Sequence, residues 1–281
     1  MPAAATCIAN SFDTPVADMK FASLGSGSEG NGLVVQAGEG PGCTRVLVDC
    51  GFGLRELDRR LRRLGLTAAD LHAVLVTHEH GDHASGVAAL VRRNGIPVHM
   101  TPGTARACAR AALAPQLLRL FDPHAPFELR GLRVEPFPVP HDACEPVQYV
   151  FDDGRARLGV LTDIGHATAL LPRVLARLDG LVLECNHDTA MLRDGHYPPA
   201  LKRRVGGAYG HLCNDDAASL LAGLDQSRLS RVVAAHLSRH NNRPELARAA
   251  LAEALGADPE DVFVADQDLG LDWQPLDGPS A

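Results

Sequence analysis

The sequence predicts a single α/β domain, and three observations support this prediction. Short apolar runs of the β type alternate with amphipathic helical patterns along most of the chain. The 281 residues could form one large domain or two small ones, but no internal repeat, low-complexity linker or convincing boundary divides them. Imidazole and carboxylate side chains directly follow several of the apolar runs, which indicates a functional site at one edge of a sheet.

The two ends and the cysteines indicate a cytoplasmic protein folded over residues 19–281. The first eighteen residues lack the basic segment and continuous apolar core of a signal peptide, and we expect a disordered extension there. Seven scattered cysteines without a CxxC pair are typical of reduced thiols rather than a disulfide framework. No apolar run is long enough to span a membrane, so no membrane partner is expected.

Composition restricts the function only loosely. Hydrophobic residues make up 46% of the chain and charged residues 22%, as in ordinary globular proteins. The formal net charge of -7 argues against a surface that binds polyanions everywhere. A local basic groove, or metal ions that carry the positive charge, would still be compatible with an anionic substrate.

The first half of the chain predicts one sheet with its helices. The segment GSGSEGNG lies between two strands and lacks the Gly-Lys-Ser/Thr of a P-loop, so a tight hairpin is favoured over a phosphate cradle. The basic segment RELDRRLRRLG has leucines at helical spacing and predicts an amphipathic surface helix. The expected strands are 19–24, 32–37, 44–49, 73–77 and the run IPVHM, and the expected helices are 54–64, one opening near Ser85, and 103–112.

The second half predicts another set of strands and helices. Residues 121–151 are rich in proline with short apolar alternations, which indicates several short strands. Helical and β-type patterns then alternate regularly. The expected strands are 157–162, 181–185 and 229–235, and the expected helices are 167–178, 214–224 and 243–255.

The segment VTHEHGDHASGV carries the strongest functional signal. His78 and His80 are two residues apart and can point to one ion, whereas Asp82 and His83 can face a neighbouring ion. Imidazole nitrogens and carboxylate oxygens that converge from a rigid turn suit a borderline divalent metal. A solvated polar loop is the alternative, but His-x-His-x-Asp-His directly after a β-type run is specific enough to favour a metal site.

Further ligands are expected at other strand ends, because ligands must converge at one edge of the sheet. His141 follows FPVP, Asp163 ends LGVLTD and His236 ends RVVAAH. Each residue alone would more often cap a strand than bind a metal. Together with the histidine cluster, and in this order along the chain, they are expected to be ligands.

With these residues the chain resembles a metallo-β-lactamase-fold hydrolase. The resemblance implies an αββα sandwich of two mixed β-sheets flanked by helices. It implies two divalent ions, zinc or manganese with iron as an alternative, that hold a bridging hydroxide for hydrolysis. It assigns the first ion to His78, His80 and His141, the second to Asp82, His83 and His236, a bridging role to Asp163, and the orientation of a ligand to Asp49.

Two ligand positions restrict the kind of hydrolase. Oxygen-reducing relatives are expected to carry glutamate where this chain has His80, so redox chemistry is disfavoured. True β-lactamases lack the bridging aspartate, so Asp163 argues against antibiotic hydrolysis. Glyoxalase-II-type thioesterases share the ligand set and remain an alternative. Cys144 and Cys185 lie close to metal segments, but the ligand set is complete without them, and they are expected to be packing thiols.

The C-terminal half resembles ribonuclease Z-like phosphodiesterases in the segments GHLCNDDAASLLAGL and RVVAAHLSRHNN. This resemblance implies that His211 is the general acid that protonates the leaving oxygen, although it could also be an inert residue at a helix start. Glu184 and His187 of LECNHD would lie at the mouth of the site and orient His211 or a phosphate. Together with the ligand Asp82, these three residues are the expected catalytic set.

A more specific resemblance, to the YycJ/WalJ-type subfamily, extends over about residues 21–243. It is carried by ASLGSGSEGN, THEHGDHASGV, PHDACEPVQYVF, TDIGHAT, LVLECNHD, YPPALKRRV, GHLCNDDAA and HLSRHNN. It implies a bacterial cytoplasmic phosphodiesterase that digests nucleic acid, DNA rather than RNA, from 5′ to 3′. The expected substrate-binding residues are Ser28, Asn31, Lys202, Arg203, Arg204, His240 and Asn241.

Alternatives stay open at this point. The row Lys202 to Arg204 could hold successive phosphates, but it could equally be a solvated helix face. The same metal site would also serve a small-molecule enzyme, either a cyclic-nucleotide or cyclic ribose-phosphate phosphodiesterase or a thioesterase. A non-catalytic metal-bound binding protein is a third possibility. The sequence leaves the oligomeric state undetermined.

Overall fold

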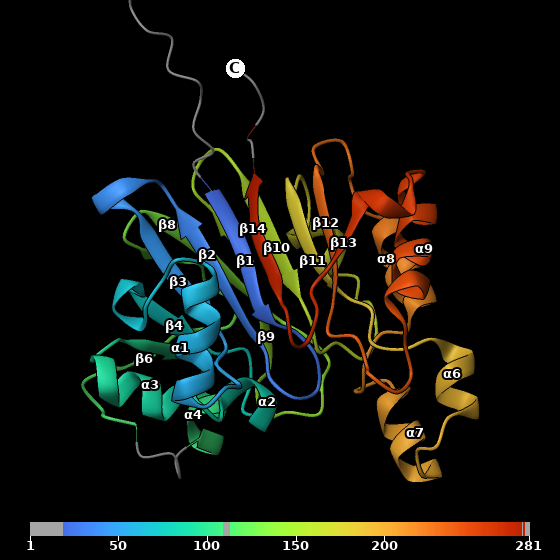
Figure 1. Cartoon of the computed structure of the whole chain (residues 1–281), viewed down its shortest axis with the longest axis horizontal. Helices are drawn as coiled ribbons and strands as arrows, with labels where there is room; N and C mark the ends of the chain where they lie inside the picture. Colours follow the sequence, from blue (N-terminus) through green and yellow to red (C-terminus); the bar gives the residue numbers. More distant parts are fainter. Residues whose placement is uncertain (1–18, 109–112, 277, 279–281) are drawn as a thin grey trace, which may run out of the picture.

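Two seven-stranded mixed sheets pack face to face, and helices cover their outer faces, as Figure 1 shows. This computed structural model describes residues 19–108, 113–276 and 278. The predicted αββα sandwich is therefore confirmed. The prediction for residues 1–18 lies outside the described residues. No helix within the described ranges is both long and apolar enough to cross a membrane.

The first sheet contains the N-terminal strands and the last strand of the chain. Its strand order is β14-β1-β2-β3-β4-β5-β6, antiparallel from β14 to β3 and parallel from β3 to β6. The strands are β1 (Met19–Gly25), β2 (Gly32–Ala37), β3 (Thr44–Val48), β4 (Ala73–Leu75), β5 (Val98–Met100), β6 (Leu118–Leu120) and β14 (Leu271–Leu276). The helices on this side are α1 (Leu54–Arg63), α2 (Gly81–Ala84), α3 (Val87–Asn94) and α4 (Pro102–Ala107).

The second sheet repeats this plan. Its strand order is β13-β12-β11-β10-β9-β8-β7, antiparallel from β7 to β10 and parallel from β10 to β13. The strands are β7 (Phe127–Leu129), β8 (Leu132–Pro138), β9 (Val147–Asp152), β10 (Arg157–Leu161), β11 (Gly180–Glu184), β12 (Arg231–Ala235) and β13 (Val262–Val264). The helices are α5 (Leu171–Val174), α6 (Thr189–Asp194), α7 (Pro199–Val205), α8 (Asn214–Ala222) and α9 (Pro244–Leu255).

Three apolar clusters hold these layers together. The cluster between the sheets includes the fully buried rings of Phe21, Tyr149 and Phe151. A second cluster lies under α1 and α3, and a third lies under α5, α8 and α9. Helix α1 illustrates the local reason: Leu57 and Leu61 are buried on one face, as the leucine spacing predicts. The strand ends are thereby held rigidly at one edge of the sandwich.

Some elements differ from the sequence-based expectations. The helix predicted at 103–112 ends at Ala107, and residues 109–112 lie outside the described part. The helix predicted at 167–178 is only the single turn α5, and Arg177 beyond it has a left-handed φ of 55°. Helices α6 and α7 and strand β14 were not predicted. The sequence of β14, LDWQPL, alternates apolar and polar residues only over four positions before a proline, and its pairing with β1 makes it a strand.

Candidate metal centre

The seven predicted metal ligands converge at one edge of the sandwich. Potential ligand atoms of His78, His80 and His141, called the first group here, lie within 4.8 Å of one another. The same holds for Asp82, His83 and His236, called the second group. These residues come from the loop after β4, the single-turn helix α2, the loop after β8 and the end of β12. Segments far apart in the sequence therefore build one compact cluster.

Backbone strain at three strand ends aims side chains into this cluster. Asp49 follows β3, Asp163 follows β10 and His236 follows β12, and their φ angles are 60°, 51° and 56°. Left-handed backbone costs a non-glycine residue roughly 1–3 kcal/mol, and such strain concentrates at functional sites. Each of the three residues leaves its strand in a tight turn, and this turn places its carboxylate or imidazole at the edge of the sheet.

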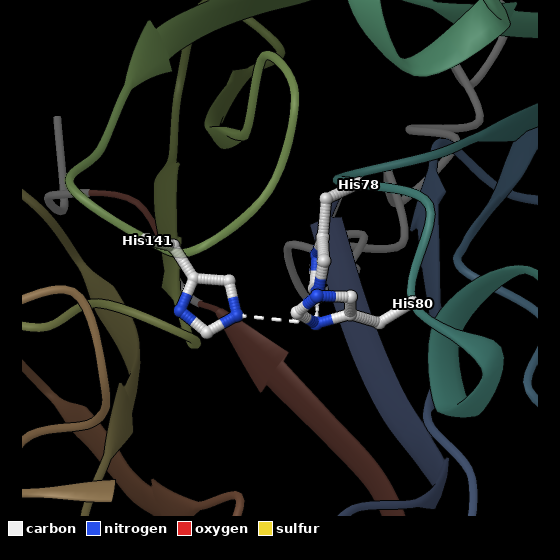
Figure 2. A group of neighbouring side chains, drawn as sticks. All are labelled: His78, His80 and His141. Atoms are coloured by element: carbon white, nitrogen blue, oxygen red, sulfur yellow. Dashed lines mark hydrogen bonds between the residues drawn. The ribbon is translucent and has the colours of Figure 1, made fainter. Parts of the chain in front are cut away.

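The imidazoles of the first group contact one another (Figure 2). His78 Nε2 lies 3.0 Å from His80 Nδ1, and His141 Nε2 lies 3.3 Å from the same atom. His141 Nδ1 is 3.1 Å from the Gly210 carbonyl oxygen, to which it can donate. Burial lowers the pKa of His78 well below its ordinary value and also lowers the pKa of His141. Neutral imidazoles with free lone pairs are the form that a metal ion requires.

Asp163 lies between the two groups. Its Oδ2 is 3.2 Å from His83 Nε2, and its Oδ1 is 3.6 Å from His236 Nε2 and 3.8 Å from His141 Nε2. Asp82 Oδ2 completes the second group at 3.5 Å from His83 Nε2 and 3.7 Å from His236 Nε2. The position of Asp163 is the one expected of a residue that ligates ions on both sides.

Buried carboxylates support the imidazoles of the second group. Asp49 Oδ2 lies 2.8 Å from His83 Nδ1, and Glu184 Oε1 lies 3.0 Å from His236 Nδ1. Burial alone would lower the pKa of His83, but Asp163 and Asp49 outweigh it and raise that pKa well above its ordinary value. Burial also opposes protonation of His236, yet Asp163 and the other nearby carboxylates raise its pKa to about 10. Carboxylate–histidine pairs of this kind orient metal ligands in proteins.

The residues present fit a divalent metal ion. Among the described residues, Asp163 Oδ2 and His236 Nε2 are buried side-chain atoms without a hydrogen-bond partner. Buried polar atoms are rarely left unpaired, so His236 Nε2 requires a partner that protein atoms do not provide, and Asp163 Oδ2 has His83 Nε2 at 3.2 Å as its nearest charged neighbour. Imidazole and carboxylate donors at this density are the preferred ligands of zinc, manganese and iron(II).

A cavity of about 360 Å³ opens over the cluster. Its wall contains His80 of the first group, Asp82 and His236 of the second group, and Asp163. The predicted residues His211, Ser28 and Arg204 also line it. Its remaining lining residues are Gly81, Asp142, Tyr197, Leu201, Val205 and Gly210. The cavity is therefore part polar and part apolar, with α7 as one wall.

The predicted acid His211 is held by Glu184. Its Nδ1 lies 2.8 Å from Glu184 Oε1, the oxygen that also contacts His236. Glu184 Oε2 accepts hydrogen bonds from the backbone N–H groups of Ile164 and Leu212. Glu184 is fully buried, so it lies beneath His211 and not at the mouth of the site as expected. The strand β11 that carries it is central in the sheet, which explains this depth.

Several predicted residues lie away from the cavity. Lys202 donates to the Arg193 carbonyl, and Arg203 is exposed without lining the cavity. His240 is exposed next to the Tyr197 ring, with centroids 6.0 Å apart. Asn241 is 1% exposed, and its side chain donates to Ser238 Oγ, so it does not face a substrate.

His187 and the cysteines also lie outside the metal cluster. His187 is buried, and its Nδ1 has no hydrogen-bond partner among the described residues. Its backbone pairs with Cys213 next to α8, and His187 does not line the cavity, so it does not lie at the mouth of the site as expected. Cys144 is exposed and Cys185 is buried, and neither belongs to a group able to hold a metal ion within the described ranges.

Asp142 and Tyr197 were missed by sequence reasoning. Asp142 Oδ2 accepts a hydrogen bond of 2.6 Å from Arg204 Nε, and its Oδ1 lies 3.7 Å from His80 Nε2. Its position directly after the ligand His141 was an available signal. Tyr197 lies between two short helices that were not predicted, and the signal available for it was its place at the start of the segment YPPALKRRV.

Comparisons with known proteins agree with this geometry. The family model described as "Beta-lactamase superfamily domain" matches residues 44–236. Exodeoxyribonuclease YycJ of Bacillus anthracis is 34% identical over 84% of this chain and 89% of its own length. Exodeoxyribonuclease WalJ of Streptococcus pneumoniae is 29% identical over 92% of this chain and 93% of its own.

Solved structures show the same architecture. The metallo-β-lactamase fold protein YhfI from Bacillus subtilis superposes with a TM-score of 0.70 at 17% identity, over 91% of this chain and 98% of that one. At this identity the likeness concerns the fold alone. The family match and the YycJ relative carry the assignment further, because each spans most of the chain. This chain therefore belongs to the β-lactamase superfamily, within its YycJ/WalJ-type branch, and is a hydrolase of the metallo-β-lactamase fold.

Proposed function

We propose that the protein is a dinuclear-metal phosphodiesterase that digests DNA from the 5′ end. The observation that carries the proposal is the His211–Glu184 pair, which lies beside the metal ligands and lines the open cavity. Relatives named exodeoxyribonucleases support DNA as the substrate. The first and second groups would each hold one ion, zinc or manganese, with Asp163 shared between them.

Different side chains would have different roles in such a reaction. Two divalent ions would polarise the phosphoryl oxygen and activate the attacking water. His211 uses Nδ1 for Glu184, which leaves Nε2 as its available ring nitrogen. Burial disfavours the protonated form of His211, but Glu184 outweighs it and raises the pKa of this imidazole. His211 can therefore deliver a proton to the leaving oxygen.

Arg204 is the proposed contact for a substrate phosphate. It is the one member of the row Lys202 to Arg204 that lines the cavity. Its guanidinium is paired with Asp142, so an incoming phosphate would compete with that carboxylate. Ser28 of the glycine-rich loop lies on the cavity wall and is a second proposed contact. We further propose a cytoplasmic location, in agreement with free thiols at all six cysteines of the described ranges.

A turnover panel tests this function. The metal-free protein is reconstituted with manganese or zinc and assayed on 5′-labelled DNA, RNA, bis-p-nitrophenyl phosphate, a 2′,3′-cyclic nucleotide and a glutathione thioester. We expect progressive shortening of DNA, with a loss of about 10²- to 10⁴-fold in His211→Ala. The loss should be smaller on bis-p-nitrophenyl phosphate, because p-nitrophenolate leaves without much protonation.

His196→Ala is the matched control, since His196 is exposed and does not line the cavity. It should digest DNA at the wild-type rate. The cavity of about 360 Å³ is also the size of a small-molecule site, which favours a small phosphodiester or thioester as the second candidate. Cleavage confined to a small ester, with DNA and RNA intact, would replace the exonuclease proposal by that candidate.

A further inference from the structure

The glycine-rich loop between β1 and β2 contacts the metal centre through Asn31. This residue is 7% exposed. Its Oδ1 accepts a hydrogen bond of 2.9 Å from Gly27 N, and its Nδ2 donates one of 2.9 Å to Gly27 O. These two bonds to one peptide segment distinguish the oxygen of the amide from its nitrogen. The second N–H of Asn31 therefore points away from the loop, toward the second group.

The free N–H of Asn31 meets two predicted ligands. Asn31 Nδ2 lies 3.0 Å from His83 Nε2, 3.4 Å from Asp82 Oδ2 and 3.3 Å from the Asp82 carbonyl oxygen. Since Asp49 occupies His83 Nδ1, Nε2 is the ring nitrogen left for an ion. With that lone pair on an ion, the Asn31 proton still has two acceptors on Asp82.

Hydrogen bonds of the loop's backbone and of Ser26 also contact residues of the second group. Asn31 N donates to Asp82 O at 2.7 Å, and Gly51 N donates to Asn31 O at 2.9 Å. A Cβ on Gly51 would overlap the Asp82 carbonyl oxygen, so only glycine permits this approach. Ser26 Oγ accepts a 2.8 Å hydrogen bond from the backbone N–H of His236. One loop thus touches all three residues of the second group.

The first group is held by other segments. Among the described residues, no hydrogen bond joins residues 25–31 to His78, His80 or His141. From this asymmetry we propose that Asn31 is a positioning residue for the second ion, and that it fixes Asp82 and His83 in their ligating arrangement. The inference rests on the proposed two-ion function. It replaces the expected role of Asn31 in substrate binding, which the burial of its side chain contradicts.

Zinc titration of the full-length metal-free protein tests this role. Isothermal calorimetry with a competing chelator measures the two binding steps separately. Residues that support metal ligands typically contribute 10- to 100-fold in affinity, so Asn31→Ala should weaken one step by about that factor and leave the other unchanged. His236→Ala identifies the step that belongs to the second group, and the step weakened by Asn31→Ala should be the same one.

Asn214→Ala is the matched control. Asn214 is also a buried asparagine, but its amide exchanges hydrogen bonds with Asn242 and contacts no metal ligand. It should bind both ions with wild-type affinity. If Asn31→Ala does not fold, Ser26→Ala provides the test, because it removes only the hydroxyl acceptor of His236 N and should weaken the same step by a smaller factor.

The outcomes separate this inference from the proposed function. Two zinc ions in the wild type and in Asn31→Ala, with equal affinities, would overturn the role of Asn31 and leave the two-ion proposal standing. Equal weakening of both steps would also overturn it, since the role is specific to the second group. A single ion in the wild type would overturn the two-ion proposal itself, and this inference with it.

Discussion

In the first group three imidazoles contact one another, whereas in the second group each imidazole also contacts a buried carboxylate. His141 donates to a backbone carbonyl, and burial lowers the pKa of His78 and His141. His83 and His236 contact Asp49 and Glu184, and carboxylates raise their pKa values. The histidines of the two groups thus lie in different electrostatic environments, one that favours the neutral imidazole and one that favours the protonated form.

This difference concerns charge balance. The first group contains no carboxylate, so an ion bound there depends on the neighbouring Asp163 and Asp142 to offset its charge. The second group contains Asp82 and has further carboxylates behind its histidines. It also contributes two residues to the cavity wall, where the first group contributes only His80. We therefore expect the second group to be the side on which substrate is handled.

The largest expected effect comes from Asp163→Asn, which removes the charge that both groups share. Metal ions contribute several kcal/mol to such a reaction, so kcat/KM should fall by about 10³-fold or more. Metal analysis after dialysis should show that both ions are lost or weakly held. Retention of two ions with normal turnover would contradict the shared role. An unchanged cellular phenotype despite lost turnover would favour a non-catalytic binding function.

A smaller effect is expected at Tyr197, on the wall of the cavity. This ring lines the cavity together with His211 and Arg204. Stacking of a base on an aromatic ring contributes roughly 1–3 kcal/mol, so Tyr197→Ala should lower kcat/KM on DNA by about 5- to 150-fold. Steady-state digestion of short 5′-labelled DNA measures the loss.

The Tyr197 prediction has an internal control in the substrate. DNA with an abasic 5′ end has no terminal base to stack, so Tyr197→Ala and the wild type should digest it equally. Tyr209→Ala is the matched protein control, because Tyr209 is 63% exposed and does not line the cavity. An equal loss on normal and abasic ends would mean that Tyr197 supports the fold of α6 and α7 and does not contact a base.

The smallest effect is expected on the pH dependence of stability, at His99, a half-buried neutral imidazole that is not a predicted metal ligand. His99 on β5 stacks on Phe127 with ring centroids 5.5 Å apart, and burial lowers its pKa to about 4. Its contribution to stability is complete above pH about 6.5, the ordinary histidine pKa, and is lost as the pH falls toward 4. His99→Phe keeps the stacked ring and removes the titration.

Urea unfolding at pH 4.5 and pH 7.5 measures this difference. Relative to the wild type, His99→Phe should gain about 1 kcal/mol at the lower pH, after allowance for the solvent contact of this half-buried ring. Contributions of the metal cluster cancel between the two proteins at each pH. An identical pH dependence would show that His99 does not carry this acid sensitivity.

Much of the architecture and of the ligand set was predictable because the signals are local. A β-type run followed by a ligand residue marks Asp163 and His236 without any knowledge of their neighbours. The substrate side was not predictable in this way. Arg204 lines the cavity and Arg203 does not, although they are adjacent, since only the packing of the short helix α7 decides which side chain faces inward.

By itself the sequence determined the types of ligand, their spacing and the alternation of elements, since these depend on residues close together in the chain. Only the tertiary structure decided which polar neighbours support those ligands. Glu184 is buried under two histidines, and Asn31 is turned toward Asp82 and His83. Such contacts join segments more than fifty residues apart in the case of Asn31, and they depend on which strand ends lie side by side at the edge of each sheet, which no local pattern encodes.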